Sequence, residues 1–306
     1  MQLRPAARLG LYFLLALSPL LWASNAVVGR MVSTAIPALT FNFVRWVTGL
    51  LILLPLTFTV FRRGSPYWAQ WKRYAVLGAL GMGGYSSLQY TALKTSSAIN
   101  VTLVAASMPI WILLIGVLFF GQRITMRQVM GLVLSLAGVV LVLSRGQLDT
   151  LLTLRLVTGD FYAVAAAMGW ALYSWLLTNN RDHNDPMRSH WTWFLAAQML
   201  PSIIMSGALA GGDWALHSDS LRLDWSWTLV IAIVYVAVGP GLIAYKIWDV
   251  GLRRVGPASA GFIANLAPVF AALLSAIFLG EGPELFHALA FALIVGGIVV
   301  SARKAD

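Results

Sequence analysis

The chain has 306 residues, of which 59% are hydrophobic and only 10% are charged. Soluble domains carry roughly 25% charged residues, and a water-soluble chain of this length could not bury so much apolar surface. The composition therefore predicts an integral membrane protein. Cysteine is absent, which excludes disulfides and thiolate metal sites. The net charge of +10 could indicate nucleic-acid binding. In residues 62–73, however, Lys and Arg side chains lie beside Trp68 and Trp71, a combination that favours binding to lipid headgroups.

Apolar runs follow one another along the whole chain. Arg4 and Arg8 precede the first run, which extends from Leu9 to about Val28. This run has features of a signal peptide cleaved near Ala23, but it is long for one, and we expect a membrane helix. Further runs follow at 37–61, 74–93, 98–120, 127–144, 159–179, 190–210, 226–252, 257–279 and 285–302. The sequence thus predicts an all-α integral membrane protein with ten transmembrane helices.

One apolar run of the first half returns in the second half. Residues 97–121 and 256–280 are both uncharged, and each has a proline near its centre, Pro109 and Pro268. Subtraction gives 268 − 109 = 159, and this offset also pairs other like residues: Leu93 with Leu252, Phe119 with Phe278, Gly121 with Gly280 and Gly138 with Gly297. Matches at a single offset indicate a duplication, so we expect two five-helix repeats, 1–148 and 149–306.

The arrangement of basic residues predicts the orientation of the chain. If the N-terminus is cytoplasmic, most Lys and Arg residues fall in inside segments, including the basic pairs at 62–63, 72–73 and 253–254. The positive-inside rule then places both termini in the cytoplasm, and we expect a multi-pass protein of a bacterial inner (plasma) membrane. Since five spans is an odd number, the second repeat must be inverted, as is usual in secondary transporters.

Short motifs in both halves follow a family pattern. They are Tyr90-Thr91-Ala92-Leu93-Lys94, Ser97-Ala98, Pro109 and Phe119-Phe120-Gly121-Gln122 in the first copy, and Gly251-Leu252-Arg253, Ala258, Pro268 and Leu279-Gly280-Glu281 in the second. With Phe43-Val44-Arg45-Trp46 they resemble the drug/metabolite transporter superfamily, EamA type, over nearly the whole chain. The many Trp and Tyr residues make the chain most similar to the YddG-type exporters of aromatic amino acids. The resemblance implies ten helices and carrier activity, although Gln122 stands where many relatives have Glu.

Aromatic and neutral polar residues inside the spans are the candidate binding groups. An indole N–H or a phenol within a membrane needs a hydrogen-bond partner that lipid cannot supply. The resemblance places most of the helices that carry these residues around a central cavity. The candidate substrate-binding residues are Trp22, Asn25, Tyr85, Ser107, Trp111, Trp170, Tyr173, Tyr245 and Asn265. Such a set suits a zwitterionic amino acid, and ordinary helix packing is the competing interpretation.

Three prolines within spans are candidate hinges. Pro109 and Pro268 occupy equivalent positions near the midplane, and Pro240 lies between two glycines in the eighth span. Proline interrupts the hydrogen bonds of a helix, so these positions could bend during transport or could simply kink for packing.

Charged side chains inside the spans are few. Arg45 in the second helix could reach the interface or bind carbonyl groups of neighbouring helices, and we expect it to have a structural role. Lys246 and Asp249 lie three residues apart on one helix face, so we expect them to pair with each other.

The sequence offers little support for chemistry other than transport. Its four histidines lie at loops or span edges without metal-ligand spacing, and it has no P-loop motif. We therefore expect no enzymatic activity, cofactor, metal or nucleic acid, and the expected partners are a small-molecule substrate and membrane lipid. The leading expectation is export of aromatic and other neutral amino acids, or similar small metabolites, by alternating access. The alternatives are a multidrug or cationic toxic-compound efflux carrier, which the lack of an acid in the first helix disfavours, and a non-transporting membrane enzyme or scaffold.

Overall fold

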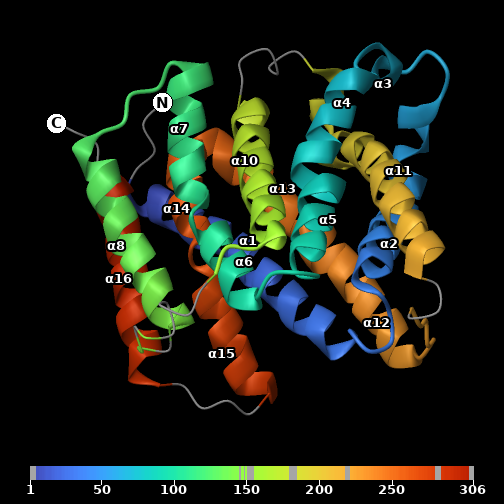
Figure 1. The fold of residues 1–306 in the computed structure, drawn as a ribbon. Helices are drawn as coiled ribbons and strands as arrows, with labels where there is room; N and C mark the ends of the chain where they lie inside the picture. Colours follow the sequence, from blue (N-terminus) through green and yellow to red (C-terminus); the bar gives the residue numbers. More distant parts are fainter. Residues whose placement is uncertain are drawn as a thin grey trace.

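The computed structural model describes residues 5–144, 146, 147, 149, 155–178, 185–217, 221–279 and 284–302. Within these ranges every regular element is helical, and the helices pack side by side in one bundle (Figure 1). The motif residues Gly280 and Glu281 of the second copy lie outside the described ranges. The expected all-α fold class is therefore confirmed for the described chain.

The first half of the chain folds into these elements: α1 (Pro5–Met31), α2 (Ala38–Thr57), η1 (Phe58–Phe61), α3 (Pro66–Ala69), α4 (Trp71–Leu77), η2 (Gly78–Met82), α5 (Gly83–Ala92), α6 (Ala98–Ala106), α7 (Met108–Phe120) and α8 (Met126–Leu143). The η2 element is a turn of π-helix that joins α4 to α5 without a break. The expected fourth span is divided into α6 and α7, which are bent by 42°.

The second half of the chain folds into a similar series: α10 (Thr158–Thr178), η4 (Pro186–Ser189), α11 (Trp191–His217), α12 (Trp227–Val236), η5 (Ala237–Ile243), α13 (Ala244–Val255), α14 (Pro257–Ala264), α15 (Ala267–Leu279) and α16 (Leu285–Ala302). The η5 element is again π-helical, and it joins α12 to α13. The helices α10 and α13 lie in the middle of the bundle, and α8 and α16 lie together at one side (Figure 1).

Length and apolar composition identify seven candidate membrane spans among the described residues, or eight if the bent pair α6 and α7 counts as one span. The seven are Gly10–Met31, Ala38–Phe61, Met126–Leu143, Thr158–Thr178, Trp191–His217, Trp227–Val255 and Pro257–Leu274. The described part of α16 passes only as a shorter apolar helix. The helices thus support a multi-pass protein. By length and composition they account for seven or eight of the ten expected spans.

The helix bounds of the two halves repeat at the offset found in the sequence. The bounds of α8 give 126 + 159 = 285 and 143 + 159 = 302, which are the bounds of α16. The bounds of α7 give 108 + 159 = 267 and 120 + 159 = 279, which are those of α15. The π-helical turns also correspond, since 78 + 159 = 237.

Glycines bring α8 and α16 into close contact. A Cβ atom on Gly131 would lie 2.6 Å from the carbonyl oxygen of Gly297, and a Cβ atom on Gly138 would lie 2.7 Å from that of Ala290. As the residue number rises along α8, the number of its partner falls along α16, so the two helices run antiparallel. Small residues allow such an approach, which is a common way of packing helices in membranes.

The three candidate hinges lie at irregular points of the helices. Pro109 is the second residue of α7, directly after the bend at Ser107. Pro268 is the second residue of α15, and Pro240 lies inside the π-helical η5. Because proline has no N–H and its ring clashes with the carbonyl four residues earlier, a regular helix cannot continue through Pro109 and Pro268.

Candidate functional site

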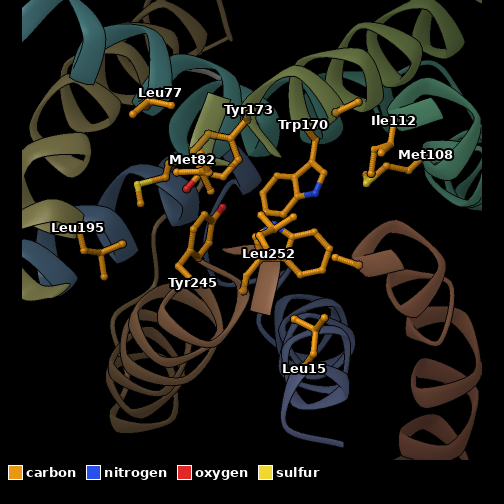
Figure 2. Packing of buried hydrophobic residues seen from close by; sticks show 14 of the residues in the cluster. Leu15, Leu77, Met82, Met108, Ile112, Trp170, Tyr173, Leu195, Tyr245 and Leu252 are labelled. Atoms are coloured by element: carbon orange, nitrogen blue, oxygen red, sulfur yellow. The ribbon is translucent and has the colours of Figure 1, made fainter. Parts of the chain in front are cut away.

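Seven aromatic rings form one connected group, which we call the aromatic cluster: Trp22, Trp46, Tyr85, Trp170, Tyr173, Tyr245 and Trp248. Trp170 lies at its centre, only 2% exposed. Its ring centroid is 5.0 Å from those of Trp22 and Tyr85, 5.4 Å from that of Tyr173 and 5.7 Å from those of Tyr245 and Trp248. Figure 2 shows Trp170, Tyr173 and Tyr245 pointing toward one another among buried apolar side chains.

The cluster forms where helices of both halves meet. Its rings come from α1, α2 and α5 of the first half and from α10 and α13 of the second. On α10 the fully buried Ala163, Ala166 and Ala167 allow the neighbouring helices to come close. Gly81 serves the same purpose opposite α10, because a Cβ atom there would lie 2.5 Å from the ring of Tyr173.

A π-helical turn holds one of the tyrosines in place. The hydroxyl of Tyr245 donates a hydrogen bond of 2.6 Å to the carbonyl oxygen of Gly81, which lies in η2. Short π-helical segments often occur at functional sites because they change the regular backbone hydrogen bonding. This bond joins α13 of the second half to η2, which lies between α4 and α5 of the first half.

Three indoles of the cluster have an unused hydrogen-bond donor. The Nε1 atoms of Trp46, Trp170 and Trp248 are buried and have no hydrogen-bond partner among the described residues. A buried donor without a partner costs about 1–3 kcal/mol. Three such donors gather in one cluster, so the cluster has hydrogen-bonding capacity that the described residues leave unused.

Arg45 of α2 adjoins the cluster and is itself only 5% exposed. Its guanidinium carbon lies 4.9 Å from the ring centroid of Trp46. Arg45 donates from Nε to Oδ1 of Asn42 at 3.0 Å, from Nη1 to Oδ1 of Asn25 at 3.2 Å and from Nη2 to Oγ of Ser86 at 2.6 Å. It therefore binds side-chain oxygens of three helices, whereas the sequence led us to expect the interface or backbone carbonyls.

The structure brings six of the nine predicted binding residues to this site. Trp22, Tyr85, Trp170, Tyr173 and Tyr245 belong to the cluster, and Asn25 is joined to it through Arg45.

The other three predicted residues have partners elsewhere. The indole N–H of Trp111 donates to Oγ of Ser107 one turn earlier, at 3.1 Å. The amide of Asn265 is buried and donates to Oγ of Ser135 on α8, at 2.8 Å. The Asn265 amide thus joins the C-terminal end of α14 to α8, a contact that its sequence position alone did not show.

Three residues of this site, Arg45, Trp46 and Trp248, were not among the predicted binding residues. Trp248 lies three residues after Tyr245 and so on the same helix face, which was a usable signal. Trp46 directly follows the charged Arg45 in the motif of the second helix, but its direction depends on how α2 is rotated against α13.

The ion pairs are formed by side chains other than the cluster rings, although the pair of Asp249 with Arg188 lies close to Tyr173. Asp185 accepts a bond of 2.9 Å from Arg73 and another of 2.8 Å from the hydroxyl of Tyr74. Asp249 pairs with Arg188 at 3.3 Å and with Arg253. Lys246 lies over the ring of Trp191, 4.5 Å from its centroid, which differs from the expected pair of Lys246 with Asp249.

The profile of the EamA-like transporter family matches residues 9–144 and 157–303, so both halves of the chain follow the same pattern. The chain belongs to this family. Family membership indicates a transporter that acts on a small molecule, and the apolar helices place this EamA-like protein in a membrane as a multi-pass chain.

Relatives of this EamA-like chain include named exporters. An uncharacterized transporter of Archaeoglobus fulgidus is 23% identical over 96% of this chain and 97% of its own length. The aromatic amino acid exporter YddG of Ancylobacter novellus is 28% identical over 79% of this chain and 78% of its own. A probable terminal-alkyne amino-acid exporter of Streptantibioticus cattleyicolor is 23% identical over 75% and 72%. One solved structure aligns with a TM-score of 0.72 at 24% identity over 95% of this chain and 96% of its own, which shows a shared fold.

Proposed function

We propose that this EamA-like protein is a secondary carrier that exports aromatic and other neutral amino acids, or similar small metabolites, by alternating access. The observation that carries the proposal is the aromatic cluster, in which seven rings from five helices of both halves meet. Aromatic pairs gain about 0.5–1.5 kcal/mol beyond burial, so the cluster favours a solute with a ring or another apolar body. Two relatives named as amino-acid exporters support this substrate class.

For the architecture we propose ten transmembrane helices arranged as two inverted repeats, 1–148 and 149–306, with both termini in the cytoplasm of a bacterial inner membrane. The offset of the helix bounds and the antiparallel contact of α8 with α16 support the inversion. In inverted repeats, an exchange of conformation between the halves exchanges which side of the membrane has access to the site.

For the moving parts we propose hinges at Pro109, Pro240 and Pro268. Their support is that each lies at a helix start or within a π-helical turn, where backbone hydrogen bonds are already interrupted. The hydrogen bond from Tyr245 to Gly81 would couple movement of η5 and α13 to η2 of the first half.

The test uses purified protein in liposomes loaded with phenylalanine, threonine or a planar cation. We expect phenylalanine to move fastest, threonine more slowly and the cation least. Transport of the cation alone would favour multidrug efflux, and transport of none of the three would contradict the proposal. Empty liposomes and liposomes with heat-inactivated protein provide the background rate.

A further inference from the structure

The buried guanidinium of Arg45 has neutral hydrogen-bond partners in place of a carboxylate. It has no ion pair among the described residues, and its three hydrogen bonds go to Asn25, Asn42 and Ser86. The buried carboxylates of the described residues have other partners. Asp160 accepts hydrogen bonds from Ser96 and Asn100, Asp185 binds Arg73 and Tyr74, and Asp213 pairs with Lys94. A buried charge is costly unless it is paired, so an uncompensated arginine inside a membrane helix marks a site for a negative group.

The three neutral partners fix the guanidinium and leave it able to bind further. Arginine has five N–H donors, and each of its three nitrogens uses one here, so two donors remain on the two Nη atoms. Asn42 is fixed in turn, since its amide donates to Oγ of Ser87 at 3.0 Å. A guanidinium held in this way loses little conformational freedom when it binds a carboxylate.

The guanidinium and the aromatic cluster are adjoining parts of one site. Arg45 lies over the ring of Trp46, whose centroid is 5.5 Å from that of Tyr245. Asn25, which Arg45 binds, lies three residues after Trp22 on α1, so both side chains occupy one helix face. The indole N–H groups of Trp46, Trp170 and Trp248, which have no partner among the described residues, could also donate hydrogen bonds to a carboxylate.

We propose that Arg45 binds the carboxylate of the transported solute, and that the site therefore selects a carboxylate attached to an aromatic or apolar body. The proposal rests on the proposed function, because it assigns the aromatic cluster to the same solute. Asp249, which follows Trp248 on α13 and lies close enough to Tyr173 to act on it electrostatically, is paired with Arg188 and Arg253. Because Arg45 supplies the contact with the carboxylate, solutes with the same ring but no carboxylate should bind more weakly.

The test is a matched series of ligands measured by equilibrium binding to the purified wild-type protein. The series is phenylalanine, phenyllactate, phenylalaninamide and phenethylamine, of which the first two carry a carboxylate and the last two do not. We expect the amide and the amine to bind at least about tenfold more weakly than phenylalanine, because a charge-assisted hydrogen bond is lost, and phenyllactate to keep measurable binding.

Arginine variants then locate the effect. R45Q should bind phenylalanine and phenylalaninamide with similar affinity, R45K should keep part of the preference for the carboxylate, and R62Q, at an exposed arginine, should behave as wild type. If R45Q does not fold, the ligand series on the wild-type protein alone still decides. Amide and acid binding equally would overturn the role of Arg45 and leave the exporter proposal standing. Binding of none of the four would contradict the exporter proposal itself.

Discussion

Replacing Gly297 by alanine should destabilise the protein, whereas the same change at the preceding Gly296 should not. A Cβ atom on Gly297 would lie 2.5 Å from the carbonyl oxygen of Gly131, but one on Gly296 would have nothing within 4 Å. An ordinary contact begins at 3.4 Å, so α8 and α16 would have to separate by 3.4 − 2.5 = 0.9 Å. Overpacking of this kind costs about 1–3 kcal/mol. At Gly296 the main effect is the higher helix propensity of alanine, which should stabilise the helix by up to about 1 kcal/mol.

The measurement is thermal unfolding of both purified variants in the same detergent. G297A should melt below wild type and G296A at or above it. Transport preference in liposomes should be unchanged in both variants, because α8 and α16 contribute no ring to the aromatic cluster. Equal melting temperatures for G296A and G297A would refute the close antiparallel contact and remove the main structural support for inverted repeats.

Three further predictions concern movement, topology and packing. Pro→Ala at Pro109 or Pro268 should slow turnover more than it weakens phenylalanine binding, and an unchanged rate in the folded double variant would leave both prolines as packing features. Because the chain has no cysteine, single cysteines introduced at 62–73 should be labelled only from the inside and those at 211–225 only from the outside. Labelling of 62–73 from the outside would contradict the inverted arrangement. N265L should lower the free energy of unfolding by about 1–3 kcal/mol, because the buried hydroxyl of Ser135 loses its partner, and should keep the substrate preference. A changed preference would support a binding role for Asn265.

Much of the helical arrangement follows from local sequence. The apolar run expected at 285–302 coincides with α16, because an uninterrupted apolar segment between polar turns has few alternatives in a membrane. The break near Pro109 was also predictable, since proline removes a backbone donor. The π-helical turn at Gly78–Met82 was not, because it depends on contacts across the bundle, including the hydroxyl of Tyr245 on Gly81.

The candidate site was only partly predictable for a related reason. Depth in the membrane can be read from position in a span, and on this basis we selected Trp170 and Tyr245, whose rings lie together in the structure. The direction of a side chain around its helix depends on which neighbour the helix packs against. The sequence therefore did not predict that Asn265 donates to Ser135, or that three neutral oxygens hold Arg45 beside Trp46.

The most direct test of the central claim is the substrate preference of W170A in liposomes, compared with wild type and with W227A, a change at an exposed tryptophan outside the cluster. Loss of ring contacts worth about 0.5–1.5 kcal/mol each should weaken the affinity for phenylalanine by roughly threefold to tenfold or more. Threonine should lose less, and W227A should behave as wild type. W170F, which keeps a ring, should fall between W170A and wild type. If W170A folds and retains the wild-type affinities and order of preference, the aromatic cluster is ordinary packing and does not form the substrate site.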